Sequence, residues 1–137
     1  MNVLLALLDA DHGDHAFARE WLRSEISGGW ASCNVTQNGF LRIVSQPRYP
    51  SPVAPAQAIA RLAAASTSTH HQFLTSSISL LDGAIVSPTK ILSSRHVTDV
   101  YLLALATAHD ARLVTFDRSI PLSAVNRASS ANLVVLR

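Results

Sequence analysis

Two aspartates, Asp99 and Asp117, lie eighteen positions apart in the stretch HVTDVYLLALATAHDARLVTFD, which covers residues 96–117. The apolar residues after Asp99 recur with the period of a helix, which predicts Asp99 in its first turn and Thr98 as the N-cap. Asp117 follows LVTF, a run typical of a short parallel strand that is buried on both faces. A helix packed on such a sheet runs antiparallel to the next strand, so we expect both carboxylates at the sheet edge where α/β proteins bind ligands.

This pair of acids favours metal-assisted phosphate chemistry. Taken singly, each has a structural explanation, because an acid in a first turn offsets the helix dipole and an aspartate after a strand often begins a turn. Together, two neighbouring carboxylates raise each other's proton affinity unless a cation lies between them. Mg²⁺ is commonly held by one or two carboxylates together with phosphate oxygens.

The composition predicts one globular domain over residues 1–137, with 48% hydrophobic and 15% charged residues. The net charge of +2 and the pI near 9.2 allow a nucleic-acid partner without requiring one. The apolar opening, Val3 to Leu8, is too short to span a bilayer and no positive charge precedes it, which predicts a cytoplasmic protein with no membrane partner. Cys33 is the only cysteine, which excludes an internal disulfide.

The order of the other elements predicts an α/β fold with a parallel sheet in three layers. We expect a helix from about Ala16 to Ile26, a second after Thr36 as its cap, and a third at residues 56–66. Strands are expected in WASCNV, at Gln72 to Leu74, in LVTF and in LVVLR. The sequence contains no GxSxG, GxGxxG or Walker A motif, and its six histidines form no HExxH or HxH pair.

Three segments of the chain resemble the PIN domain of the VapC type, the toxin of a bacterial toxin–antitoxin pair. They are NVLLALLDADHGDHAFAREWL, GWASCNVTQNGFLRI and RHVTDVYLLALATAHDARLVTFD, which together reach from residue 2 to residue 117. The resemblance implies a three-layer α/β/α PIN-like fold with a parallel central sheet. It also implies a Mg²⁺-dependent endoribonuclease, with Mn²⁺ as a possible substitute, whose partners are the RNA substrate, a neutralising VapB-like antitoxin and a second copy in a homodimer.

The family has four acidic positions around its metal, and this sequence matches two of them. Asp99 and Asp117 are therefore the expected metal ligands and catalytic residues. In the second of the three segments the family usually has Thr-Glu before its helix, and this chain has Thr36-Gln37, so Gln37 takes the place of an acid. It can orient water or substrate with its carbonyl oxygen, but it adds no negative charge. The family's first strand and its aspartate would lie before Met1, so we expect a start upstream of Met1 rather than a decayed relative.

Two other interpretations remain open at this stage. The chain could be a catalytically inactive PIN domain that binds only antitoxin or RNA, or an unrelated α/β protein that uses Asp99 and Asp117 for a ligand. If the site is complete, the arginines Arg42, Arg95 and Arg118 are candidates for contacts with backbone phosphates.

Overall fold

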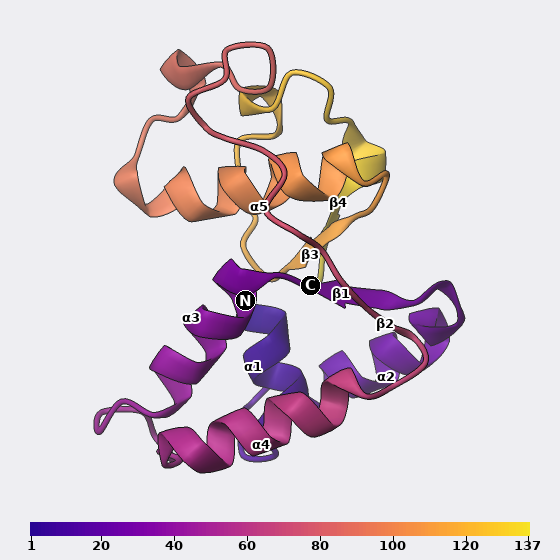
Figure 1. The fold of residues 1–137 in the computed structure, drawn as a ribbon, viewed down its shortest axis with the longest axis vertical. Coiled ribbons are helices and arrows are strands. Elements are labelled where there is room, and N and C mark those ends of the chain that lie inside the picture. The colour runs from indigo at the N-terminus through magenta and orange to yellow at the C-terminus, as the bar shows by residue number, and fades with distance from the viewer. The chain divides into compact units, whose positions relative to one another are not determined.

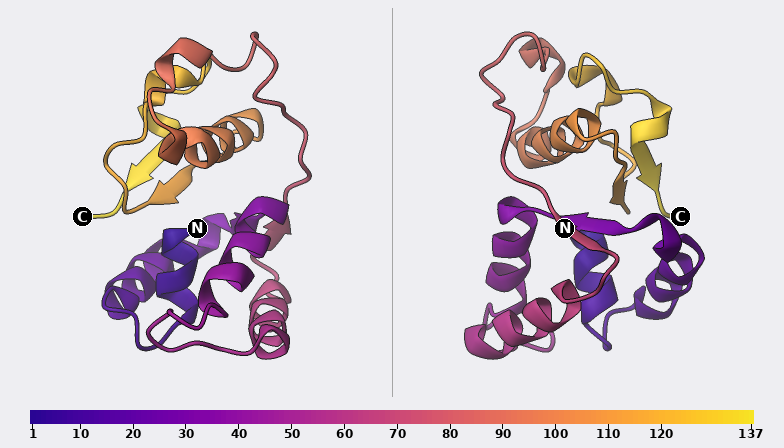
Figure 2. Two further views of the ribbon diagram at one scale, coloured as in Figure 1. Left: turned by 90° about the vertical axis from the view of Figure 1, so that its left-hand side faces the viewer. Right: turned by 45° about the vertical axis from the view of Figure 1, so that its right-hand side comes forward.

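A computed structural model describes all 137 residues as two compact units, Met1–Thr75 and Ser76–Arg137. Each unit is described by itself, and each contains helices and one pair of parallel strands (Figures 1 and 2). The expected α/β class with parallel strands is confirmed, and the strands form two separate pairs. No helix is both long and apolar enough to cross a bilayer. The single domain expected over residues 1–137 stays a prediction.

The first unit contains four helices and the strand pair β1–β2. Its elements are α1 (Asn2–Leu8), α2 (His15–Glu25), β1 (Trp30–Ser32), α3 (Asn34–Val44), α4 (Pro55–Ser66) and β2 (His71–Phe73). The two strands pair in parallel, with Trp30 opposite His71 and Ser32 opposite Phe73. Side chains at paired and alternate positions share one face of a sheet, so these four residues lie on the same face.

Helices α1, α3 and α4 enclose the core of the first unit. Phe40 and Val44, four positions apart on α3, are fully buried, and Ala58 and Leu62 repeat this spacing on α4. Leu5 of α1 completes the cluster. Spacing of four residues places side chains on one helix face, so the apolar pattern of the sequence directly determines which faces meet.

The second unit is built around one buried helix. Its elements are α5 (Val97–Ala108), β3 (Leu113–Thr115) and β4 (Leu133–Val135), with short 3-10 helices at Pro88–Lys90, Ser94–His96, Leu122–Ala124 and Ser130–Asn132. β3 and β4 pair in parallel from Leu113 opposite Leu133 to Thr115 opposite Val135. The remainder of residues 76–96 has no long regular element, and this stretch is also the part of the sequence with the weakest periodicity.

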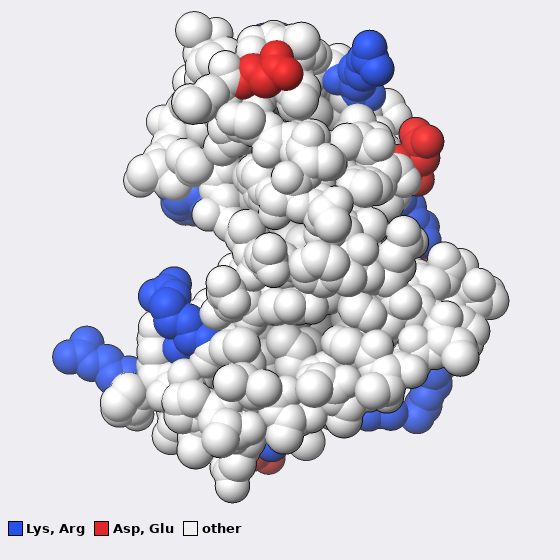
Figure 3. Space-filling model, viewed as in Figure 1, with Lys and Arg blue, Asp and Glu red and all other residues white.

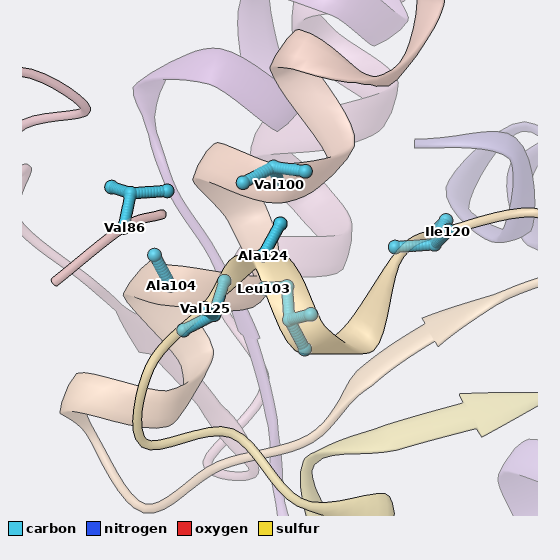
Figure 4. Packing of buried hydrophobic residues seen from close by; sticks show 7 residues of the cluster. All are labelled: Val86, Val100, Leu103, Ala104, Ile120, Ala124 and Val125. Atoms are coloured by element: carbon cyan, nitrogen blue, oxygen red, sulfur yellow. The ribbon is translucent and has the colours of Figure 1, made fainter. Parts of the chain in front are cut away.

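Val100, Leu103 and Ala104 of α5 form the centre of the second unit's core (Figure 4). The residues packed on them come from the segments on either side of α5 in the sequence: Val86, Ile120, Ala124 and Val125. Six residues of α5 are buried, and they extend beyond a single stripe. A helix that is apolar around most of its circumference must be covered on several sides. The segments before and after α5 supply this cover for Val100, Leu103 and Ala104.

The structure corrects several element boundaries. The apolar opening forms the helix α1, which was not expected because so short an apolar run does not distinguish helix from strand. The N-cap of α3 is Cys33, with Thr36 at the third helical position, and the N-cap of α5 is His96 instead of Thr98. β2 begins at His71, one residue earlier than expected.

Candidate active site

Asp117 lies two residues after the end of β3, and local hydrogen bonds hold its carboxylate. The backbone N–H of Ser119 donates to Asp117 Oδ1 at 2.7 Å, and the Ser119 hydroxyl donates to the same oxygen at 2.5 Å. The Asp117 N–H in turn donates to Oγ1 of the buried Thr115 at 3.0 Å. An aspartate after a strand commonly bonds the backbone two residues on, which explains why the chain turns here.

These donors stabilise the charged form of Asp117. The side-chain and backbone hydrogen bonds from Ser119 lower the pKa of Asp117, and the positive charge of Arg95 lowers it further. The carboxylate is therefore ionised at neutral pH. An ionised, oriented carboxylate is the state that a hard cation requires of its ligand.

Asp99 occupies the first turn of α5, as predicted, and it is half-buried. Burial raises the pKa of Asp99, and the negative charge of Asp117 raises it as well, whereas His96 and Arg95 lower it. The two carboxylates thus lie within electrostatic range of each other. A cation between them would relieve the repulsion and favour the charged form of both.

Arg95 and His96, immediately before α5, connect the start of that helix to the segment after β3. Arg95 Nη2 lies 3.9 Å from Asp117 Oδ2 and donates to Ser119 Oγ at 3.3 Å. His96 Nε2 lies 2.9 Å from the same hydroxyl oxygen. Because Ser119 gives its hydrogen to Asp117, its oxygen accepts the hydrogen of His96 Nε2. The helix start and the strand end therefore lie together.

Sequence reasoning named Arg95 but missed His96 and Ser119. The available signals were weak: the spacing Asp-x-Ser predicts a local turn, and a histidine before a helix has many uses. Arg42 and Arg118 are exposed. On the surface shown in Figure 3, Lys and Arg side chains appear at separate places within each unit.

Gln37 belongs to the first unit, in the first turn of α3. Its side chain is half-buried, and its Nε2 donates to Ser32 Oγ at 3.0 Å. The amide nitrogen is thus engaged within its own unit, which leaves the carboxamide oxygen as the group able to accept a hydrogen bond. A part for Gln37 in catalysis stays a prediction, as do the metal roles of Asp99 and Asp117.

The arrangement around α5 offers oxygen ligands on one side and hydrogen-bond donors on the other. The ligands are the carboxylates of Asp99 and Asp117, and the donors are the side chains of Arg95 and His96. No group of three or more His, Cys, Asp or Glu side chains is arranged to hold a metal ion. Two carboxylates beside hydrogen-bond donors are suited to a divalent cation that is shared with a bound phosphate.

Comparisons with known proteins show which family the chain belongs to. Residues 1–126 match the PIN domain family. Over 136 residues the chain is 53% identical to Ribonuclease VapC44 of Mycobacterium tuberculosis, and the match covers 99% of this chain and 96% of that protein. It is also similar to Ribonuclease VapC38 of the same organism, at 38% identity with 88% and 84% of the two chains covered. Ribonuclease VapC29 matches at 33% identity, with 87% and 84% covered.

Proposed function

Because the chain belongs to the PIN domain family and is of the VapC type, we propose that it is a toxin endoribonuclease that cleaves RNA phosphodiester bonds with Mg²⁺. The observation that carries the proposal is the pairing of Asp99 with Asp117 at the start of α5. Burial and Asp117 both favour protonation of Asp99, while hydrogen bonds keep Asp117 charged. A cation bound between the two carboxylates would lower the repulsion between them and favour the ionised form of Asp99.

The residues present fit a hard divalent cation. Both candidate ligands offer carboxylate oxygens, and Mg²⁺ commonly takes one or two protein carboxylates and fills its other positions with water and phosphate oxygens. Mn²⁺ accepts the same ligands. When bound, the metal supplies positive charge that acidifies a water and offsets charge on the phosphodiester. Asp99 and Asp117 would hold it there.

In this proposal the side chains beside the carboxylates bind and orient the RNA phosphate. Arg95 carries a planar guanidinium that is suited to phosphate oxygens, and the bond from His96 to Ser119 holds the adjoining turn in place. With a cation on the carboxylates, Arg95 is less strongly drawn to Asp117 and can turn to a bound phosphate. Gln37 would orient water or substrate through its carboxamide oxygen.

The proposed partners follow from family membership. We expect the protein to bind RNA as substrate, to be neutralised by a VapB-like antitoxin and to form a homodimer in the cytoplasm. Co-purification with the antitoxin, followed by an assay of RNA cleavage before and after its removal, tests the neutralisation. Unchanged cleavage by the complex would contradict it.

The activity is tested with a fluorescent single-stranded RNA, with Mg²⁺ and with EDTA. Cleavage should require the metal, and Asp99→Asn should abolish cleavage, since it keeps the side-chain shape but removes the ligand charge. Asp110→Asn is the matched control. Asp110 is exposed, lies beyond the other end of α5 and has a φ of 51°, which asparagine adopts as readily as aspartate. Equal losses in both variants would show that net charge alone matters.

Gln37 favours a second candidate function, an inactive PIN domain that only binds RNA or antitoxin. A carboxamide in place of a carboxylate weakens attraction for a cation. This candidate predicts RNA binding by fluorescence anisotropy without cleavage at any Mg²⁺ concentration. Gln37→Glu should then create or increase Mg²⁺-dependent cleavage, whereas a wild-type protein that already cleaves RNA efficiently would eliminate this candidate.

A further inference from the structure

A chain of side-chain hydrogen bonds in the first unit connects Gln37 to a histidine on a different strand. Gln37 Nε2 donates to Ser32 Oγ at 3.0 Å, and Ser32 Oγ lies 2.8 Å from His71 Nε2. Ser32 is the last residue of β1 and is only 4% exposed. His71 is the first residue of β2, directly opposite Trp30. The parallel register of the two strands therefore creates the contact.

The chemistry of these three groups fixes the direction of each hydrogen bond. The amide nitrogen of Gln37 can only donate, so the Ser32 oxygen accepts. A buried hydroxyl hydrogen needs an acceptor, and among the two partners of Ser32 Oγ only His71 Nε2 can accept. His71 Nε2 then carries no hydrogen. The hydrogen of the neutral ring lies on Nδ1.

The surroundings of His71 support the neutral ring. Burial lowers the pKa of His71, and a backbone hydrogen bond with Ser66 raises it to a smaller extent. The Trp30 ring also packs on His71, with ring centroids 4.4 Å apart. The imidazole thus has the Trp30 ring beside it and the Ser32 hydroxyl at Nε2.

We propose that Ser32 and His71 are positioning residues that hold the Gln37 side chain with its amide nitrogen toward Ser32 and its carbonyl oxygen outward. A carboxamide has two different ends, so its value as an acceptor depends on which end is presented. A carboxylate has two equivalent oxygens and needs no such selection. The use of the Gln37 oxygen in RNA cleavage rests on the proposed function, but the positioning does not.

The proposal makes a spectroscopic prediction that is independent of activity. In ¹⁵N-labelled wild-type protein, long-range ¹H–¹⁵N spectra should show His71 as the tautomer with hydrogen on Nδ1, and His71→Gln identifies its signals among the six histidines. Gln37→Glu should reverse the direction of the bonds. The carboxylate must accept from the Ser32 hydroxyl, so His71 must donate from Nε2. A wild-type ring with hydrogen on Nε2, or an unchanged tautomer in Gln37→Glu, would overturn the proposal.

The kinetics of RNA cleavage by variants test whether the positioning of Gln37 matters for catalysis. Ser32→Ala should lower kcat for RNA cleavage by about tenfold with less change in KM, as expected when one orienting hydrogen bond is lost. Ser32→Thr keeps the hydroxyl and should restore most of the rate. Since Ser32 and His71 act through Gln37, adding Ser32→Ala to Gln37→Ala should cost little more than Gln37→Ala alone.

The tautomer measurement and the cleavage kinetics test the positioning of Gln37 and its use in catalysis separately. Additive losses in the double variant, or no rescue by Ser32→Thr in a folded protein, would overturn the catalytic use of the positioning. A wild-type protein that shows the expected tautomers but never cleaves RNA would contradict the proposed function and support the positioning. Circular dichroism of each variant identifies any that fail to fold, and Ser32→Thr provides the conservative replacement in that case.

Discussion

Tyr49→Phe should destabilise the unit of residues 1–75 by about 1–2 kcal/mol, because it removes the main partner of a buried carboxylate. Asp9 follows α1 and is only 7% exposed. The Tyr49 hydroxyl donates to Asp9 Oδ2 at 2.5 Å, and the Asp11 N–H donates to Oδ1 at 3.0 Å. Phenylalanine keeps the ring and leaves Oδ2 without its donor.

The magnitude follows from the kind of bond that is lost. A hydrogen bond to a charged group contributes about 1.5–3 kcal/mol to stability, and an unpaired buried acceptor carries a cost of similar size. Tyr49 itself is only half-buried, so water can partly replace the hydroxyl and reduce the loss. A change of this size corresponds to a fall in Tm of roughly 3–8 °C for a domain of this size class.

The same contact makes stability depend on pH in the alkaline range. The pKa of Tyr49 is raised from 10.0 to about 12, most of all by burial and further by the hydrogen bond to Asp9 and the charge of Asp9. A group whose pKa is raised by folding contributes fully below its unfolded pKa, and this contribution is lost as pH rises through the folded value. The wild-type advantage over Tyr49→Phe should therefore shrink between pH 10 and pH 12. After allowance for solvent exposure, this change is roughly 1 kcal/mol.

Chemical denaturation of both proteins at neutral pH and at several alkaline values measures these differences. Tyr101→Phe is the matched control, since it removes another hydroxyl from the chain. Equal stability of wild type and Tyr49→Phe at neutral pH would refute the account of the Asp9 contact. If the stability difference between wild type and Tyr49→Phe stays constant up to pH 12, the predicted effect of Tyr49 ionisation is refuted.

Three further predictions concern the second unit. Saturating Mg²⁺ should raise the Tm of the wild type but not of Asp99→Asn, with stabilisation of about 2.7 kcal/mol at a metal concentration of 100 times Kd; equal shifts in both would place the metal elsewhere. Leu103→Ala should cost about 2–5 kcal/mol in denaturant unfolding, because Leu103 is 0% exposed in the core. As the control for Leu103→Ala, Leu81→Ala should change stability little, because the Leu81 side chain is 96% exposed. Ser119→Ala should raise the pKa of Asp117, measured by carboxyl NMR titration, because one of its two Ser119 donors is lost; an unchanged pKa would contradict the role given to that hydroxyl.

The sequence predicted the parts of the fold that arise from local periodicity. Asp99 in the first turn of α5 and the strand before Asp117 were both expected, since a long apolar helix followed by a compact apolar run is a strong pattern. α1 was missed because seven residues do not distinguish helical from extended periodicity. The helix caps were also wrong, since Thr36 and Thr98 are good capping residues and the tertiary structure decided which residues begin α3 and α5.

The candidate site was predicted less completely, because its hydrogen bonds join residues far apart in the sequence. Ser32 and His71 are thirty-nine positions apart, and only the parallel register of β1 and β2 brings them together. His96 and Ser119 are separated by twenty-three positions and meet where the helix start reaches the strand end. No local motif encodes either contact. Residue type could indicate the acids, but not the groups that orient them.

Cys33 begins α3, the helix that carries Gln37, and its side chain is 3% exposed. Since it is the only cysteine, a thiol reagent can modify the folded chain at one position alone. The reagent can reach that sulfur only when the structure around it opens, so the rate of modification in the native protein reports local opening at the start of α3. The modification rate of this single thiol thus measures how often this helix start opens, without any introduced label.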